Sequence, residues 1–145
     1  MFYILSDTEV ALNEILVACQ QSIDYYEDTL TGLRDEKPIR TINNILEQRK
    51  QFSTDLEEII LDLGSLPSAP DPDKETGELI IEKVAASLSE NDTNYIIANR
   101  IEAEKHILSL LDLTKNSDLK EPHQRVLDNL TTQVKQTIKE LTALL

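Results

Sequence analysis

The chain has 145 residues, of which 40% are apolar, with three glycines, one cysteine and no tryptophan. This composition favours a helical bundle, because sandwiches and barrels need more turns and more β-branched and aromatic residues. The net charge of −13 argues against binding to nucleic acid or to an anionic membrane surface. No apolar run is long enough for a membrane span, no secretory signal is evident, and a single cysteine fits a reducing compartment. We therefore expect one cytoplasmic all-α domain over residues 1–145.

The first predicted helix covers about residues 7–35. Ser6-Asp-Thr-Glu9 has the form of a capping box, in which the hydroxyl and the carboxylate bind free amides of the first turn. Apolar residues then recur at steps of three and four, as expected for one buried helix face. They are Leu12, Ile15, Leu16, Cys19, Ile23, Tyr26, Leu30 and Leu33.

The second predicted helix covers residues 38–63 and follows a short polar link, which indicates an antiparallel pair. Pro38 suits the first turn of this helix, and Gly64 suits the position just after its end. Residues 65–75 contain three closely spaced prolines, which forbid a helix and favour an extended crossover strap.

The remaining apolar periodicity predicts a short helix over 76–89 and two long helices over 93–115 and 119–144. Four long helices with two short links and one long crossover indicate an antiparallel four-helix bundle of the ferritin-like type, with one additional short helix before the third long one. A helical adaptor without ferritin kinship is the alternative architecture.

Several core positions also carry a family resemblance. Leu12-Asn13-Glu14-Ile15, with Cys19 and Tyr26, resembles the first helix of uncharacterised bacterial ferritin-like proteins, which reads roughly LNxLIxxCxDGxxGY. Arg49-Lys-Gln-Phe52, Leu56 and Leu63-Gly64 extend the resemblance into the second helix. It spans nearly the whole chain and implies the ferritin-like fold and kinship with proteins built around a di-iron centre. It implies no activity, because the family is a domain of unknown function.

A di-iron centre in such a bundle needs one inward carboxylate from each of two helices and Glu-x-x-His from each of the other two. Helical spacing places Ile23 at the central inward position of the first helix, and Arg49 with Phe52 on the second. Only Glu104 supplies an inward acid, on the third long helix, and the last helix offers no acid or histidine near its centre. Ile23 and Phe52 are therefore read as vestigial site positions. No metal or other cofactor is expected.

Arg49 and Glu104 are the only central inward charges on their helices, so we expect a buried ion pair between them. Arginine suits this role because its planar fork can bind a carboxylate with two hydrogen bonds and stays ionised when buried. The alternative is that Arg49 extends to solvent and that water hydrates Glu104. If a metal binds at all, the expected ligands are Glu104 with Glu27 or Glu102.

The remaining residues that could carry chemistry are expected to have structural roles. Cys19 is expected to be a core thiol, and Tyr26 a core aromatic residue whose hydroxyl reaches a polar group or solvent. His106 should be exposed and His123 should lie in the first turn of the last helix. The sequence thus predicts no catalytic residue and favours a non-catalytic structural or interaction module, whose partner is a second copy or an unknown protein. The alternative is an iron-binding ferritin-like protein with an incomplete or intersubunit site.

Overall fold

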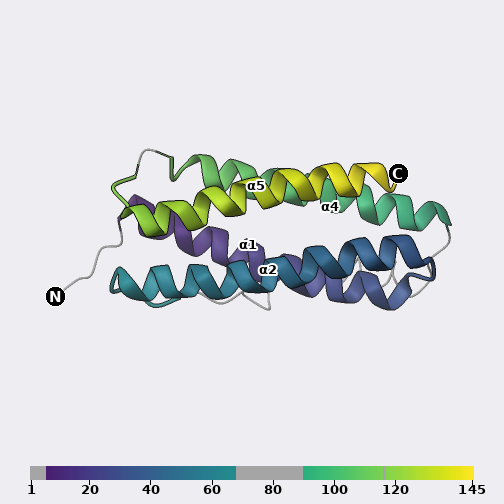
Figure 1. Ribbon diagram of the computed structural model, residues 1–145, viewed down its shortest axis with the longest axis horizontal. Coiled ribbons are helices and arrows are strands. Elements are labelled where there is room, and N and C mark those ends of the chain that lie inside the picture. The colour runs from purple at the N-terminus through teal and green to yellow at the C-terminus, as the bar shows by residue number, and fades with distance from the viewer. Residues whose placement is uncertain (1–5, 68–89, 116) are drawn as a thin grey trace.

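The computed structural model describes residues 6–67, 90–115 and 117–145, and four long helices make up most of this part of the chain (Figure 1). The predicted short helix over 76–89 and most of the predicted strap over 65–75 lie outside the described residues. The bounds of the long helices differ from the predicted ones by a few residues at most. The helices are α1 (Asp7–Gly32), α2 (Glu36–Asp62), α4 (Glu90–Asp112) and α5 (Glu121–Ala143).

The four helices form an antiparallel bundle. α1 packs against α2 and α4, and α5 packs against the same two helices. Each helix is therefore antiparallel to the two helices it packs against, while α2 and α4 run parallel on opposite corners of the bundle (Figure 1). The end of α2 and the start of α4 lie at opposite ends of the bundle (Figure 1).

The start of α1 has the predicted serine cap. The backbone N–H of Glu9 donates to Ser6 Oγ over 3.2 Å, which satisfies one of the amides left free in the first turn. The Ser6 hydroxyl in turn donates to the Glu9 carboxylate over 3.1 Å. The helix therefore begins at the residue that the capping pattern indicates. α5 begins instead at Glu121, with Lys120 at the cap position, two residues after the predicted start.

The end of α2 depends on the left-handed backbone of Gly64, whose φ is 84°. Its N–H donates to the carbonyl of Leu61, and the N–H of Ser65 donates to the carbonyl of Ile60. These are the two hydrogen bonds of a Schellman motif, which satisfies carbonyls at a helix end.

We predict that Gly64→Ala lowers the free energy of unfolding by about 1 kcal/mol, because a Cβ disfavours the left-handed conformation. The substitution causes no steric clash, because a Cβ at this position would meet no atom within 4 Å. Gly64→Asn is the matched variant, because asparagine tolerates this conformation better. Urea denaturation should rank the wild type above G64N and G64N above G64A. An alanine variant as stable as the wild type would contradict the assignment.

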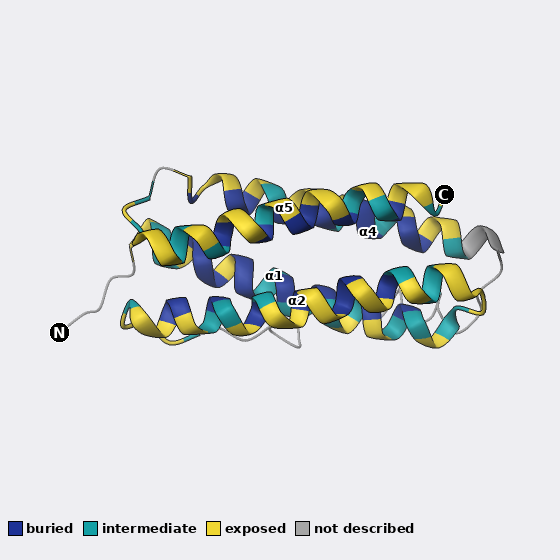
Figure 2. Cartoon of the chain, in the orientation of Figure 1, coloured by how far each residue is buried: buried dark blue, intermediate teal, exposed yellow. Residues whose placement is uncertain are grey.

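Two apolar clusters fill the bundle along its length, and the buried faces of all four helices turn toward them (Figure 2). We name each cluster after one of its members. The Leu16 cluster comprises Leu12, Ile15, Leu16, Cys19, Leu56, Ile59, Ile60, Ile107, Leu110, Leu111, Leu127, Leu130 and Val134. The Ile42 cluster comprises Tyr26, Ile42, Ile45, Leu46, Ile97, Ile101 and Leu141.

No helix in the described part of the chain has an apolar stretch long enough to cross a membrane.

Candidate functional site

A buried polar layer separates the two apolar clusters. On each helix its members follow or precede the cluster residues by about one turn, so the antiparallel packing brings them to the same level of the bundle. All of them are at most 8% exposed. The polar layer comprises Ser22 of α1, Arg49 of α2, Glu104 of α4, and Gln133 and Thr137 of α5.

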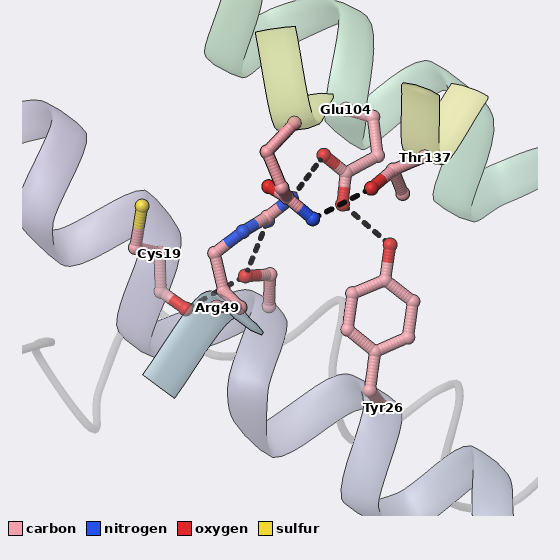
Figure 3. Close-up of polar contacts among 7 residues, drawn as sticks. Cys19, Tyr26, Arg49, Glu104 and Thr137 are labelled. Carbon is pink, nitrogen blue, oxygen red and sulfur yellow. Dashed lines mark hydrogen bonds and ion pairs between the residues drawn. The ribbon is translucent and has the colours of Figure 1, made fainter. Parts of the chain in front are cut away.

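An ion pair crosses the centre of this layer. Arg49 and Glu104 come from opposite corners of the bundle, and Arg49 Nη2 lies 2.7 Å from Glu104 Oε2 (Figure 3). Their side chains are 0% and 1% exposed. Leaving either charge unpaired at this depth would cost several kcal/mol, so the two groups are energetically tied to each other.

Neutral polar groups complete the surroundings of the Arg49 guanidinium. It donates from Nη1 to Ser22 Oγ over 2.9 Å and from Nη2 to Gln133 Oε1 over 3.0 Å. The Gln133 amide donates onward to Thr137 Oγ1 over 2.7 Å, and the Ser22 hydroxyl donates to the backbone carbonyl of Cys19 over 2.7 Å. Only Nε of Arg49 has no hydrogen-bond partner. The network thus fixes the guanidinium from three helices.

The second oxygen of Glu104 accepts a hydrogen bond from the Tyr26 hydroxyl (Figure 3). Burial, followed by the Glu104 charge, raises the pKa of Tyr26 well above its ordinary value. Burial by itself would lower the pKa of Arg49, but the carboxylate of Glu104 raises it overall. The layer therefore holds a guanidinium and a carboxylate bound through both oxygens. Tyr26, from the adjoining Ile42 cluster, contributes a phenol that keeps its proton.

Cys19 lies at the edge of the layer and is fully buried. Burial raises the pKa of its thiol to about 11, and the nearby Arg49 charge offsets only part of that effect. Because the thiolate is the nucleophilic form, the raised pKa and the burial of Cys19 disfavour its reaction as a nucleophile at neutral pH. It serves as an apolar core residue.

The structure places the predicted site residues as follows. It brings Arg49 and Glu104 together, but Ser22 takes the place in the layer that helical spacing gave to Ile23. Ile23 is half-buried and packs against the Ile42 cluster. One residue turns a helix by about 100°, so a small error in the inferred face is enough to exchange the two. Phe52 is also half-buried and packs against the Leu16 cluster.

The other acids proposed as ligands face outward. Glu27 and Glu102 are exposed and lie 3.8 Å and 3.2 Å from Lys50 and Lys105. The register of each helix turns both carboxylates to solvent. The alternative that a metal binds Glu104 with Glu27 or Glu102 stays a prediction.

The histidines also lie outside the layer. His106 is exposed on α4, while His123, in the first turn of α5, lies 3.2 Å from Asp62 at the end of α2. The described residues include no group of three or more His, Cys, Asp or Glu side chains that could hold a metal ion.

Three features of this region were not predicted from the sequence. They are the hydrogen bond from Arg49 to Ser22, the hydrogen bond from Tyr26 to Glu104, and the burial of Arg100. The available signal for Arg100 was its place between Ile97 and Ile101 on α4, one turn before Glu104.

Comparisons with family models, curated proteins and solved structures find no match to this chain.

Proposed function

We propose that this chain is a non-catalytic member of the ferritin-like bundles, with a structural or protein-interaction role. In this proposal the ion pair between Arg49 and Glu104 stands where related bundles hold two metal ions. The observation that carries it is the Arg49 guanidinium, which lies fully buried at the centre of the bundle and supplies the positive charge that Glu104 requires.

The topology supports the ferritin-like part of the proposal. α1 with α2, and α4 with α5, are antiparallel pairs joined by short links. α2 and α4 run parallel on opposite corners of the bundle, and the end of α2 and the start of α4 lie at its opposite ends (Figure 1). Two antiparallel helix pairs placed in this way are typical of the ferritin-like arrangement.

The donor set of the layer does not fit a di-iron centre. Such a centre uses four inward carboxylates and two inward histidines, whereas the layer contains one carboxylate and no histidine. Both oxygens of that carboxylate already have partners in Arg49 and Tyr26. A cation would have to displace the guanidinium, which cannot leave the core without losing three hydrogen bonds.

Iron titration tests this proposal. Protein purified without chelator should contain far less than one metal ion per chain, and added Fe(II) should give no saturable binding that depends on Glu104. Wild type, Glu104→Gln and Glu102→Gln should give the same metal content by mass spectrometry. Stoichiometric iron that is lost in E104Q and retained in E102Q would overturn the proposal in favour of an iron-binding protein.

The interaction role has its own measurement. Sedimentation velocity of the full chain, with and without Fe(II), should show an assembly state that metal does not change. A dimer that forms only with iron would indicate a site shared between subunits and would contradict the proposal.

A further inference from the structure

Arg100 is a buried cation that the polar layer does not neutralise. It lies on α4, is 5% exposed, and stacks its guanidinium carbon 3.4 Å from the centroid of the Tyr25 ring and 5.9 Å from that of Tyr26. Among the described residues, no carboxylate lies within ion-pair distance of Arg100, and its Nε has no hydrogen-bond partner. The ring stacking stabilises the cation, but it satisfies none of the N–H donors.

The charges at the centre of the bundle are therefore unequal. In the part of the chain that the structure describes, two guanidinium groups, those of Arg49 and Arg100, and one carboxylate, Glu104, are buried, and the oxygens of Glu104 bind Arg49 and Tyr26. Burial lowers the pKa of Arg100, but arginine still keeps its proton. A buried cation without a hydrogen-bonded anion is costly, so an anion from solution would be stabilised beside it.

The structure has room for such an anion. Arg100 lines a cavity of about 80 Å³ at the seam between α1 and α4, together with Gln21, Ser22, Tyr25 and His106. This volume admits a small oxyanion. The donors around it include the arginine fork, which suits a carboxylate through two parallel hydrogen bonds.

The small cavity continues into a larger groove along the same seam. The two share Ala18, Gln21 and His106, and the groove has a volume of about 430 Å³, within the usual range for small-molecule sites. Its walls are largely apolar. The apolar residues that line it are Val10, Val17, Ala18 and Leu110, of which Val10 is 41% exposed.

We propose that the seam between α1 and α4 binds a small amphiphilic carboxylate, with the carboxylate on Arg100 and the apolar chain along the groove toward Val10. Glu14 lines the groove but not the smaller cavity, so its charge disfavours a second anionic group along the groove. The net charge of −13 further disfavours polyanions such as nucleotides. The cavity shares Ser22 with the polar layer, but the proposed carboxylate binds Arg100 and not Arg49. The proposal therefore holds whether or not iron binds at Glu104.

Calorimetric titration of the full chain with decanoate, kept below its micelle-forming concentration, tests the proposal. We expect saturable binding of one decanoate per chain. Hexanoate, octanoate and decanoate should bind progressively more tightly, by about two- to fourfold for each added methylene. In NMR spectra, decanoate should shift the Nε–H resonance of Arg100, while that of exposed Arg40 should stay in place.

Arg100→Met should weaken decanoate binding by about tenfold or more, the loss expected for charge-assisted hydrogen bonds. This variant should stay folded, because the change removes an unpaired charge and keeps an apolar side chain of similar length. Arg40→Met is the matched control on the exposed face of α2 and should bind like the wild type. Ala18→Leu, which fills the part shared by cavity and groove, should weaken decanoate without unfolding the protein.

Three results would overturn the proposal. Binding of decanoate to R100M as tightly as to the wild type would remove Arg100 from the site. Equal binding of decylamine would show that the carboxylate is irrelevant. Inorganic phosphate binding as tightly as decanoate would show a simple oxyanion site in which the groove contributes nothing.

Discussion

Glu104→Gln is expected to lower the free energy of unfolding by about 3–5 kcal/mol, the cost of leaving a buried charge without its partner. The substitution preserves the shape of the side chain but removes the carboxylate that pairs with buried Arg49 and whose charge also acts on buried Arg100. The amide keeps an acceptor oxygen at only one of the two positions where the carboxylate accepts hydrogen bonds from Arg49 and Tyr26. Urea denaturation followed by circular dichroism measures the loss.

The matched control is Glu102→Gln, two residues away on the same helix. Glu102 pairs with Lys105 over 3.2 Å, but its side chain is 73% exposed. Exposed pairs contribute little, so this variant should differ from the wild type by less than about 0.5 kcal/mol. If both variants lose a similar free energy of unfolding, the loss comes from any Glu-to-Gln change on this part of α4 and not from the buried charge of Glu104.

The double variant Arg49→Met with Glu104→Leu separates the pair from its surroundings. Removing both charges leaves neither member of the pair without its partner, so the double variant should be more stable than E104Q, in which Arg49 stays charged. It should still lie below the wild type, because Tyr26 and Gln133 lose their partners. If E104Q stays within 1 kcal/mol of the wild type, or if the double variant is the least stable, the ion pair does not have the assigned role.

The helices could be predicted from the sequence because apolar periodicity and end signals agree along most of the chain. Ser6 and Gly64 mark a start and an end, and the structure has both at those residues. Arg49 and Glu104 stood out because each interrupts an otherwise apolar face. Helical geometry then placed the two positions at the centre of the bundle.

The other residues of the site could not be predicted, because their positions depend on how the helices pack, and apolar periodicity carries no information about that packing. Ser22 and Ile23 differ by one step around α1, and only the orientation of the packed helix decides which of them enters the layer. Arg100 has the same side chain as exposed Arg40, and long arginines usually carry their charge to solvent. The ring of Tyr25, on a different helix, covers Arg100 instead, and no local spacing indicates that contact.

Raising the pH from 9 to 11 is expected to destabilise the fold by about 2 kcal/mol through Cys19 alone. Burial raises the pKa of this thiol from an ordinary value of 9.0 to about 11. Below pH 9 both the folded and the unfolded chain keep the proton, so the full stability is present. Between pH 9 and 11 the unfolded chain ionises ahead of the folded chain, so stability falls, by at most about 1.4 kcal/mol per pH unit.

Cys19→Ala isolates this contribution. Tyr26 also has a raised pKa and destabilises the fold in the same direction above pH 10, so the wild type should lose more than Cys19 supplies. The alanine variant starts from a lower stability at pH 7, because it leaves a small cavity, but its stability should decline later and less steeply with pH. The measurement is a series of urea denaturations from pH 7 to pH 11. The two curves of unfolding free energy against pH should therefore diverge above pH 9. If the curves of wild type and C19A stay parallel, folding does not raise the pKa of the Cys19 thiol, and the prediction is wrong.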